Sequence, residues 1–311
     1  MRFRSPFLLT SSLCLALAAP LSAQDAISAQ TGPASQNSGQ NSGQNSDGAT
    51  EGPPVGETVF DGDFLTIGLG VGLSPSYTGS DDYAVFPVPV VQASYKGIDV
   101  NPRPAGLALD FVPDSDTGGP SFDAGIAARL RSDRVDQIKD DVVLRLGELD
   151  RAVEVGPTVG ISFPGVLNPY DSISVNVDAM WDVAGAHSGM TVNPSVTYFT
   201  PLSRGIAASI TGRATFIDDD FADYYFSVSP ADTVASGGVL PQFQAEGGLQ
   251  SLGVNLFVAV DLDGDIANGG LALVGVGGYS RLMNDSKDTP LTSIRGSADQ
   301  FVVGAGIGYT F

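Results

Sequence analysis

The carboxyl-terminal stretch 297–311 constrains the fold of this chain more than any other feature. Successive side chains of a β-strand point to opposite sides, so a period of two in hydrophobicity is typical of a strand with one apolar face. Most of the intervening residues in this stretch are glycine or polar. Counted back from the end as far as Phe301, every second residue is apolar: Phe311, Tyr309, Ile307, Ala305, Val303 and Phe301.

Two classes of protein fit such a strand. Aromatic rings at a strand end form the girdle of a membrane barrel, where their apolar bodies lie in lipid and their polar tips in water. The final strand of a soluble β-sandwich shows the same alternation. The other strands therefore decide between the two classes.

The alternation recurs along the chain, most clearly in 62–73 and 173–183, where Trp181 belongs to the apolar set and Asp178 to the polar set. Strands of about 9–11 residues with one apolar and one polar face are typical of outer-membrane barrels. An open sheet edge in lipid would leave backbone groups unpaired, so the sheet must close. We predict an all-β fold: a closed antiparallel transmembrane β-barrel of about twelve strands, with ten as the alternative.

The count of twelve depends on how three segments are interpreted. It includes 224–228 as a short strand and treats the segment from Gly97 to Phe111 as one strand. It also places the Gly97 turn and the turn at 201–205 on opposite rims. The charged connection 131–151 carries apolar residues spaced for a helical turn or two.

The first 58 residues are not expected to belong to the barrel. Residues 1–23 begin with Arg2 and Arg4, continue with an apolar run and end in small residues, as in a cleavable signal peptide. Residues 24–58 repeat a Gln-Asn-Ser-Gly tetrad and predict a disordered periplasmic tether. The barrel then occupies residues 59–311. The single cysteine, Cys14, would leave with the signal peptide, which excludes disulfides from the mature chain.

The formal net charge is −20 at pH 7. No basic stripe is present in the sequence, which argues against nucleic acid as a partner. The expected partners are outer-membrane lipid, lipopolysaccharide and the barrel-assembly machinery. The acidic loop tips at 81–82 and 218–220 would contact lipopolysaccharide through divalent ions, although solvated turns are the simpler interpretation.

His187 is the only histidine, and it lies between Asp182 and Ser188. A histidine beside a serine near a barrel rim is compatible with an outer-membrane hydrolase. Neighbours on an extended chain point apart, however, and the segment has turn composition. A structural or solvated loop histidine is favoured, and no catalytic residue is predicted.

Two further motifs resemble ligand-binding loops, but their spacing does not fit. Asp261, Asp263 and Asp265 resemble the start of a calcium loop, but the glycine stands at the fourth place and Ala272 occupies the place of the bidentate glutamate. Gly68, Gly70 and Gly72 repeat with period two and precede no helix, unlike a dinucleotide loop. No metal and no cofactor are predicted.

Three ordered groups of residues carry a resemblance to a known family. They are Pro75, Tyr77, Gly79, Ser80, Asp81, Asp82 and Tyr83; then Tyr224 and Tyr225; then Arg281, Leu282, Asp285 and Pro290. Together with the closing 308–311, they resemble the MipA/OmpV family of outer-membrane proteins over residues 62–311. Phe226 departs from this pattern, where glycine is common, and so does Thr289, where serine is.

The resemblance implies a non-enzymatic barrel in the outer membrane of a Gram-negative bacterium. Some members are described as scaffolds that join a lytic transglycosylase to a peptidoglycan synthase; others are described as porin-like or adhesive. A small-solute channel and an adhesin therefore stay open as alternatives, and a hydrolase using His187 is the remote one. The motif residues are expected to shape loops, with Tyr77 and Tyr83 as rim aromatics. Tyr309 and Phe311 are expected to serve as the barrel-assembly signal.

Overall fold

The computed structural model describes residues 58–113 and 119–311. The predicted signal peptide and, apart from its last residue, the predicted tether lie outside the described residues.

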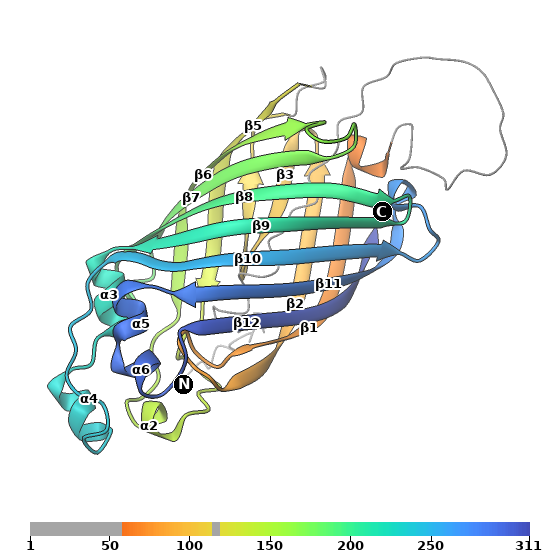
Figure 1. Ribbon diagram of the computed structural model, residues 1–311. Coiled ribbons are helices and arrows are strands. Elements are labelled where there is room, and N and C mark those ends of the chain that lie inside the picture. The colour runs from red at the N-terminus through yellow and green to blue at the C-terminus, as the bar shows by residue number, and fades with distance from the viewer. Residues whose placement is uncertain (1–57, 114–118) are drawn as a thin grey trace, which may run out of the picture.

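Antiparallel strands close into a barrel in which neighbours in sequence are neighbours in space (Figure 1). The strands are β1 (Phe64–Pro75), β2 (Tyr83–Tyr95), β3 (Ile98–Arg103), β4 (Gly106–Asp110), β5 (Ser121–Arg131), β6 (Ala152–Pro164), β7 (Ser172–Asp182), β8 (Met190–Ser203), β9 (Ile206–Ile217), β10 (Gly248–Asp261), β11 (Gly270–Leu282) and β12 (Asp299–Thr310). β1 pairs with β12 from Thr66↔Thr310 to Leu73↔Val303, which closes the ring. The predicted closed barrel of twelve strands is confirmed.

Short helices lie in the connections. They are η1 (Val59–Asp61), α2 (Asp141–Leu144), α3 (Asp219–Phe226), α4 (Pro230–Ala235), η2 (Ile266–Asn268), α5 (Asn284–Asp288) and α6 (Pro290–Ser293). None of the helices in the described ranges is long and apolar enough to cross a membrane.

Two details of the strand count were wrong, and they cancel. The segment after Gly97 forms two strands, β3 and β4, joined at Pro104 and Ala105. The predicted strand at 224–228 instead begins inside helix α3, whose first turn is capped by Asp218 accepting a hydrogen bond from the Phe221 amide. Phe221 and Tyr225 are spaced four residues apart, so this segment buries one face with the period of a helix and not of a strand.

The two ends of the barrel differ in their connections. The terminal rim, which holds the start of β1 and the end of β12, has two-residue turns at 96–97 and 204–205. The Gly97 turn and the turn after β8 therefore share a rim, contrary to the prediction, because the β3–β4 hairpin adds a strand between them. The loop rim, at the opposite end, carries the long connections 132–151, 218–247 and 283–298.

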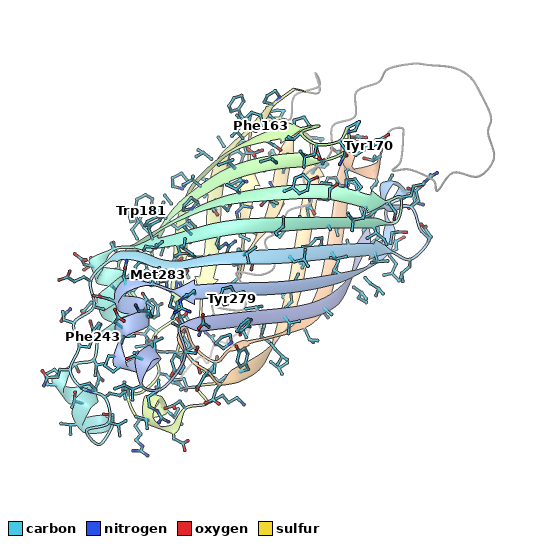
Figure 2. All side chains as sticks on the ribbon, viewed as in Figure 1. Phe163, Tyr170, Trp181, Phe243, Tyr279 and Met283 are labelled. Carbon is cyan, nitrogen blue, oxygen red and sulfur yellow. The ribbon has the colours of Figure 1, made fainter. Side chains whose placement is uncertain are left out.

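The outward face of the strands is apolar and exposed. Leu69 and Val71 in β1 are 64% and 62% exposed, and Phe301 in β12 is 54% exposed. Aromatic side chains lie toward both ends of the barrel: Phe163 and Tyr170 near the terminal rim, and Trp181 and Tyr279 near the loop rim (Figure 2). A continuous apolar belt between two aromatic zones is the outer surface of a membrane barrel.

The seam between β2 and β3 is short. These strands pair only from Ala93 to Tyr95, so in the described part of the chain 83–92 has no register partner on β3. The backbone N–H and C=O of Tyr95 point toward β3, because Tyr95 pairs with Ile98 across the two-residue turn. Pro87 and Pro89 are an even number of residues from Tyr95, so their backbone groups point the same way. Proline has no N–H to donate, and these positions place the missing donors at the unpaired edge, where the ladder loses nothing.

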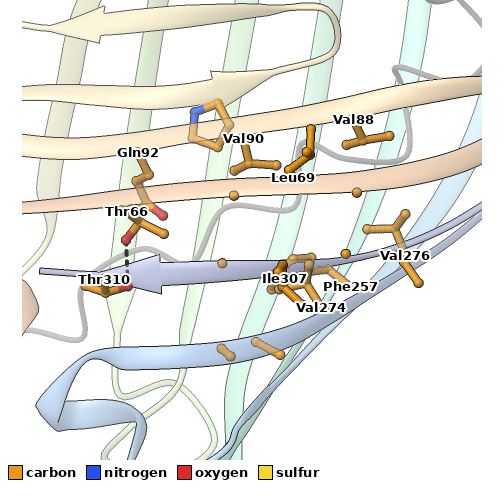
Figure 3. Close-up of a pocket in the computed structure, with 18 of the residues that line it drawn as sticks. Thr66, Leu69, Val88, Val90, Gln92, Phe257, Val274, Val276, Ile307 and Thr310 are labelled. Carbon is orange, nitrogen blue, oxygen red and sulfur yellow. Dashed lines mark hydrogen bonds between the residues drawn. The ribbon is translucent and has the colours of Figure 1, made fainter.

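The lumen has two unlike halves. Inward positions on β5–β9 are charged or hydroxyl-bearing, such as Arg129, Glu154 and Thr191. Inward positions on β1, β2 and β10–β12 are mostly glycine, alanine and valine, and they surround a cavity (Figure 3).

Candidate functional site: a loop cap over a buried charged cluster

The loop rim is covered by four connections, 76–82, 132–151, 218–247 and 283–298, which we call the cap. Their short helices gather at one end of the barrel (Figure 1). One apolar cluster contains a buried residue or more from each connection: Tyr77, Ile138, Val142, Val143, Val228, Leu240 and Leu291. Three of the connections leave from neighbouring strands of one arc, β9 to β2 through β12, and 132–151 leaves from β5 and β6 on the other side of the ring. Its contact with the other three therefore crosses the mouth of the barrel.

Helix α3 forms a second cluster beneath the first. It is amphipathic and buries Phe221, Ala222, Tyr225 and Phe226, which pack with Ile217 and Ala245. Phe243 packs against both clusters and joins them. The cap therefore has its own hydrophobic core, separate from the apolar belt of the barrel wall.

Hydrogen bonds between connections fix the cap. The Tyr77 hydroxyl donates to the carbonyl oxygens of Leu291 and Arg295, both at 3.3 Å. Arg295 also donates from Nη2 to Asp140 Oδ2 at 2.6 Å. Desolvation opposes ionisation of Asp140, but the bonds from Arg295 and from the amides of Val143 and Val142 outweigh it, so the pKa of this carboxyl is lowered.

The resemblance motifs, which lie far apart in sequence, meet in this cap. Gly79 has φ +100°, and a Cβ at this position would lie 2.3 Å from Thr292 Oγ1, so only glycine fits. Asp285 Oδ2 accepts a hydrogen bond from the Glu246 amide at 2.8 Å. The Tyr224 hydroxyl accepts one from the Asp150 amide at 2.9 Å.

Of the two tyrosines predicted as rim aromatics, Tyr77 and Tyr83, the structure agrees with one. Tyr83, the first residue of β2, is exposed. Tyr77 is fully buried in the cap, so its prediction as a rim aromatic was wrong. Burial raises the pKa of the Tyr77 hydroxyl, which stays a hydrogen-bond donor.

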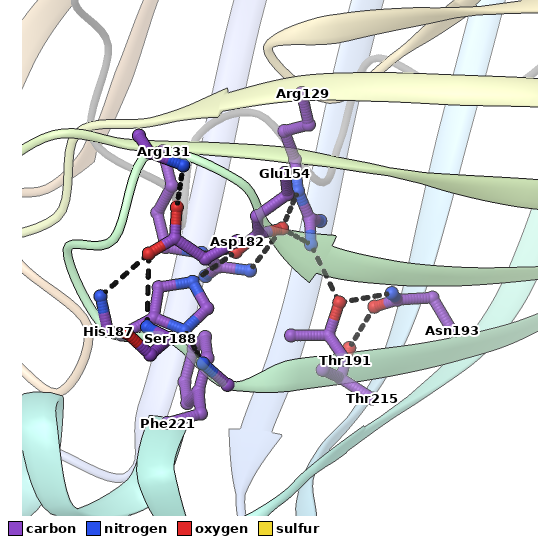
Figure 4. Close-up of polar contacts among 12 residues, drawn as sticks. Arg129, Arg131, Glu154, Asp182, His187, Ser188, Thr191, Asn193, Thr215 and Phe221 are labelled. Atoms are coloured by element: carbon purple, nitrogen blue, oxygen red, sulfur yellow. Dashed lines mark hydrogen bonds and ion pairs between the residues drawn. The ribbon is translucent and has the colours of Figure 1, made fainter.

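A charged cluster lies directly under α3 (Figure 4). Glu154 on β6 is fully buried between two arginines of β5. Arg129 Nε lies 2.9 Å from Glu154 Oε2, and Arg131 Nε donates to the other carboxylate oxygen. The two arginines are two residues apart on one strand, so both point inward, and the register sets Arg129 opposite Glu154.

Helix α3 covers this cluster with aromatic rings. The Arg131 guanidinium lies 4.6 Å from the centroid of the Phe221 ring and 5.8 Å from that of Tyr225. A cation held over a ring face is attracted by the ring quadrupole, and the attraction is greater where water is excluded. The cap is therefore joined to the barrel lumen by a cation–π contact as well as by chain connectivity.

His187 completes the cluster. Its ring is buried, and Nε2 lies 3.1 Å from Glu154 Oε1. Nδ1 accepts a hydrogen bond from the Gly189 amide at 3.0 Å, so in the neutral ring Nε2 carries the proton and donates to Glu154. Of the two predictions for this residue, the structural histidine agrees with this geometry and the solvated one does not.

The arrangement does not assemble a nucleophile and base. Asp182 Oδ2 accepts from the backbone amides of His187 and Ser188, not from the imidazole. Ser188 is exposed while the His187 ring is buried. Both ring nitrogens already have partners, so the ring offers no free lone pair to a serine hydroxyl.

A hydrogen-bonded ladder continues from the cluster across the lumen. Arg129 Nη2 donates to Thr191 Oγ1 at 3.2 Å, and Asn193 and Thr215 extend the chain to β9. Lower in the barrel, Arg103 pairs with Asp178 at 3.0 Å. Much of the polar half of the lumen is paired in this way, while Arg131 Nη1, Asp178 Oδ1 and Ser209 Oγ have no hydrogen-bond partner among the described residues.

Carboxylates of the acidic turn 261–265 are also engaged by nearby protein groups. Asp261 Oδ1 accepts from the amides of Asp263 and Gly264, both at 2.9 Å. Asp265 pairs with Arg204 at 2.6 Å. Within the described ranges, no group of three acidic, cysteine or histidine side chains is placed to hold a metal.

The alternation in the sequence does not reveal the cluster of Arg129, Arg131 and Glu154. The available signal was that Arg129 and Arg131, two residues apart, lie on the same face of one strand, and that a glutamate occurs on the next strand. The sequence does not indicate that His187 is buried, because its burial depends on α3 folding over the barrel mouth.

The motif residues were predicted as loop positions, but Arg281 and Leu282 lie in β11 and Tyr224 and Tyr225 in α3, while Pro75 and Tyr83 lie at strand ends. The structure brings the connections next to these positions together in the cap.

A closed antiparallel barrel with an apolar outer belt and aromatic zones near both rims defines an integral outer-membrane protein. The family model described as MltA-interacting protein MipA matches residues 67–311. The chain belongs to the MipA family, as the resemblance predicted.

Similar solved structures are also outer-membrane proteins. An outer membrane channel from Pseudomonas putida F1 has 12% identity and a TM-score of 0.40, covering 86% of this chain and 100% of its own. OmpT of Vibrio cholerae has 8% identity and a TM-score of 0.33, covering 79% and 97%. OprD from Pseudomonas aeruginosa has 10% identity and a TM-score of 0.27, covering 83% and 96%. Comparison with curated proteins gives no significant match.

Proposed function

We propose that this protein is a non-enzymatic scaffold in the outer membrane of a Gram-negative bacterium. The observation that carries the proposal is the cap, in which loops from separated parts of the ring share one buried core across the barrel mouth. A passive channel needs a continuous aqueous path, and a buried apolar cluster at the mouth opposes one. A scaffold needs only a rigid barrel with surfaces at its rims.

The orientation follows from the connections. Outer-membrane barrels have short turns on the periplasmic side and long loops outside. The terminal rim, with both ends of the barrel and its two-residue turns, then faces the periplasm, and the cap faces out. Partners that act on the cell wall would be held at the terminal rim.

The partner class is taken from the family. Its description names an MltA-interacting protein. We propose a lytic transglycosylase as the first partner and a peptidoglycan synthase as the second, both bound from the periplasmic side. Outer-membrane lipid and lipopolysaccharide surround the barrel, and the barrel-assembly machinery inserts it through the Tyr309 and Phe311 end.

A pull-down tests the scaffold. The tagged mature protein, solubilised from the envelope with a mild detergent, should recover a lytic transglycosylase, which mass spectrometry identifies. A matched tagged barrel of another family, purified in the same way, should not recover it. Repeated failure to recover any murein enzyme would contradict the scaffold.

Conductance tests the channel alternative, which the charged lumen lining favours. In a planar bilayer the intact protein is expected to give no steady ohmic current. A variant with residues 219–245 replaced by a short Gly-Ser linker loses α3 and α4 and should conduct. A steady current through the intact protein would favour the channel.

The hydrolase alternative is tested with His187→Ala. Because both ring nitrogens are engaged, we expect no lipid hydrolysis attributable to this residue. Hydrolysis by the wild type that disappears in the variant, while the barrel stays folded, would revive this alternative.

A further inference from the structure

An apolar cavity occupies the half of the lumen nearest the terminal rim (Figure 3). Its volume is about 120 Å³. The side chains that form its walls come from β2, β10 and β11: Val88, Val90, Phe257, Ala259, Val274 and Val276. A barrel lumen is ordinarily polar and wet, so this composition is unusual for an inward face.

Glycine creates the space. The cavity is bordered on its β1 and β12 side by Gly68, Gly70, Gly304 and Gly306. A Cβ added at Gly306 would lie 2.7 Å from the Gly70 Cα, so this wall is bare backbone that cannot take side chains without moving. The hollow is therefore fixed by the barrel backbone and not by mobile side chains.

The Phe86 ring lies next to the cavity, toward the loop rim. The Phe86 ring is buried against Gly72, where an added Cβ would lie 2.3 Å from the ring Cζ. Phe86 packs with Val88, and Val88 is part of the cavity wall. These contacts hold Val88, and with it this part of the cavity wall, in place.

Polar groups gather at the other end. Thr66 and Thr310 face each other with their hydroxyl oxygens 2.8 Å apart, and Gln92 borders the cavity beside them. Phe60 of η1 and Ile266 of η2 also border this end, so the cavity reaches the terminal rim. An apolar chamber with hydroxyl and amide groups at its mouth matches the two ends of an amphiphile.

The size defines the apolar part of the ligand. A dry cavity of about 150 Å³ binds benzene or xenon, so this one accommodates an apolar group of about six carbon atoms. Its apolar lining and few polar groups are those of a small-molecule site.

The charges at the mouth define the head group. Ile266 directly follows the turn that holds Asp261 and Asp263, and Asp265 in this turn is paired with Arg204. A carboxylate entering here would meet a field of its own sign, in a chain whose net charge is −20. A neutral hydroxyl is free of this repulsion.

We propose that this cavity binds a short neutral amphiphile, with an alkyl chain of about six carbons inside and a hydroxyl head at Thr66, Gln92 and Thr310. The site is independent of the cap and of the proposed scaffold. It gives the periplasmic end of the barrel a small-molecule ligand of defined chemistry.

The test uses 1-hexanol and hexanoate as matched probes. The mature protein in lipid nanodiscs is titrated with each probe, and binding is followed by saturation-transfer NMR, with empty nanodiscs as the background. We expect saturable binding of 1-hexanol, with hexanoate weaker by about tenfold or more. Hexanoate binding as tight as 1-hexanol would overturn the assignment of a neutral head.

Two neighbouring substitutions on β11 separate the cavity from the lipid. Val274→Phe points inward and fills the cavity, while Leu273→Phe points outward into the belt, where Leu273 is exposed. The first should abolish 1-hexanol binding and the second should leave it unchanged. If Val274→Phe does not fold, as judged by its gel mobility, Ala259→Phe fills the cavity from β10.

Equal binding to wild type and to a folded cavity-filling variant would overturn the site, because the probe would then be partitioning into lipid. No binding above empty nanodiscs would also overturn it. Neither result affects recovery of a murein enzyme in the pull-down, so the two proposals fail separately.

Discussion

At the scale of single residues, Glu154 links the barrel wall to the loop rim through its hydrogen bonds. It receives hydrogen bonds from Arg129, Arg131 and His187 and has no solvent exposure. A buried ion pair is weak evidence for net stability, but breaking one is costly, because the remaining charges stay buried without a partner. Here two arginines would be left.

Glu154→Gln should therefore destabilise the folded barrel by about 3–5 kcal/mol. The measurement is urea-induced unfolding in lipid vesicles. Asp299→Asn is the control, since Asp299 pairs with Arg281 on the exposed surface at 2.6 Å, and its loss should change stability little. Equal effects of the two substitutions would contradict the buried cluster.

Asp140 makes the docking of 132–151 dependent on pH. Its lowered pKa means that the contribution of its carboxylate is present above the unfolded value of about 3.9 and is lost as pH falls through the lower folded value. The amides of Val142 and Val143, which donate to Asp140, should lose hydrogen-exchange protection below about pH 3.9.

Arg295→Gln should move this loss of protection to higher pH, because Arg295 supplies part of the stabilisation of the carboxylate. Arg151→Gln removes the exposed pair with Asp136 on the same connection and should leave the midpoint unchanged. An unchanged midpoint in Arg295→Gln would show that this ion pair does not hold the cap.

At the scale of elements, α3 has the largest role in the cap. Its residues pack under the apolar cluster of the other connections and over the charged cluster of the lumen. The sequence predicted a strand here, because its run of aromatic residues is also typical of strands. What decides for the helix is the cap by Asp218 and the barrel mouth beneath, and only the first is visible in the sequence.

Phe221→Ala should loosen the cap, since it removes a fully buried ring that contacts both Arg131 and His187. The expected loss is about 3–5 kcal/mol in local stability, measured by hydrogen exchange across 218–247. Val234→Ala on α4 is the control, because Val234 is 80% exposed. Unaltered exchange in Phe221→Ala would mean that α3 is held by other contacts.

At the scale of the whole molecule, the sequence was sufficient for the barrel and insufficient for the cap. Alternation in β1, β7 and β12 is a local property that fixes which face meets lipid, and the exposed positions agree with it. The strand that 98–111 was expected to form divides at Pro104 into two, which local hydrophobicity does not reveal. The cap depends on contacts between residues more than 200 positions apart, such as Tyr77 with Leu291, and no period in the sequence encodes them.

The central claim is that the outward face of this barrel contacts lipid, and Trp181, the single tryptophan, reports on it directly. Trp181 is 45% exposed on the outward face toward the loop rim. The measurement is its fluorescence in vesicles of brominated phosphatidylcholine. We predict strong quenching, greater when the bromines lie near the headgroup than near the chain ends. Full fluorescence in every brominated lipid, with quenching only by a water-soluble agent, would contradict the account.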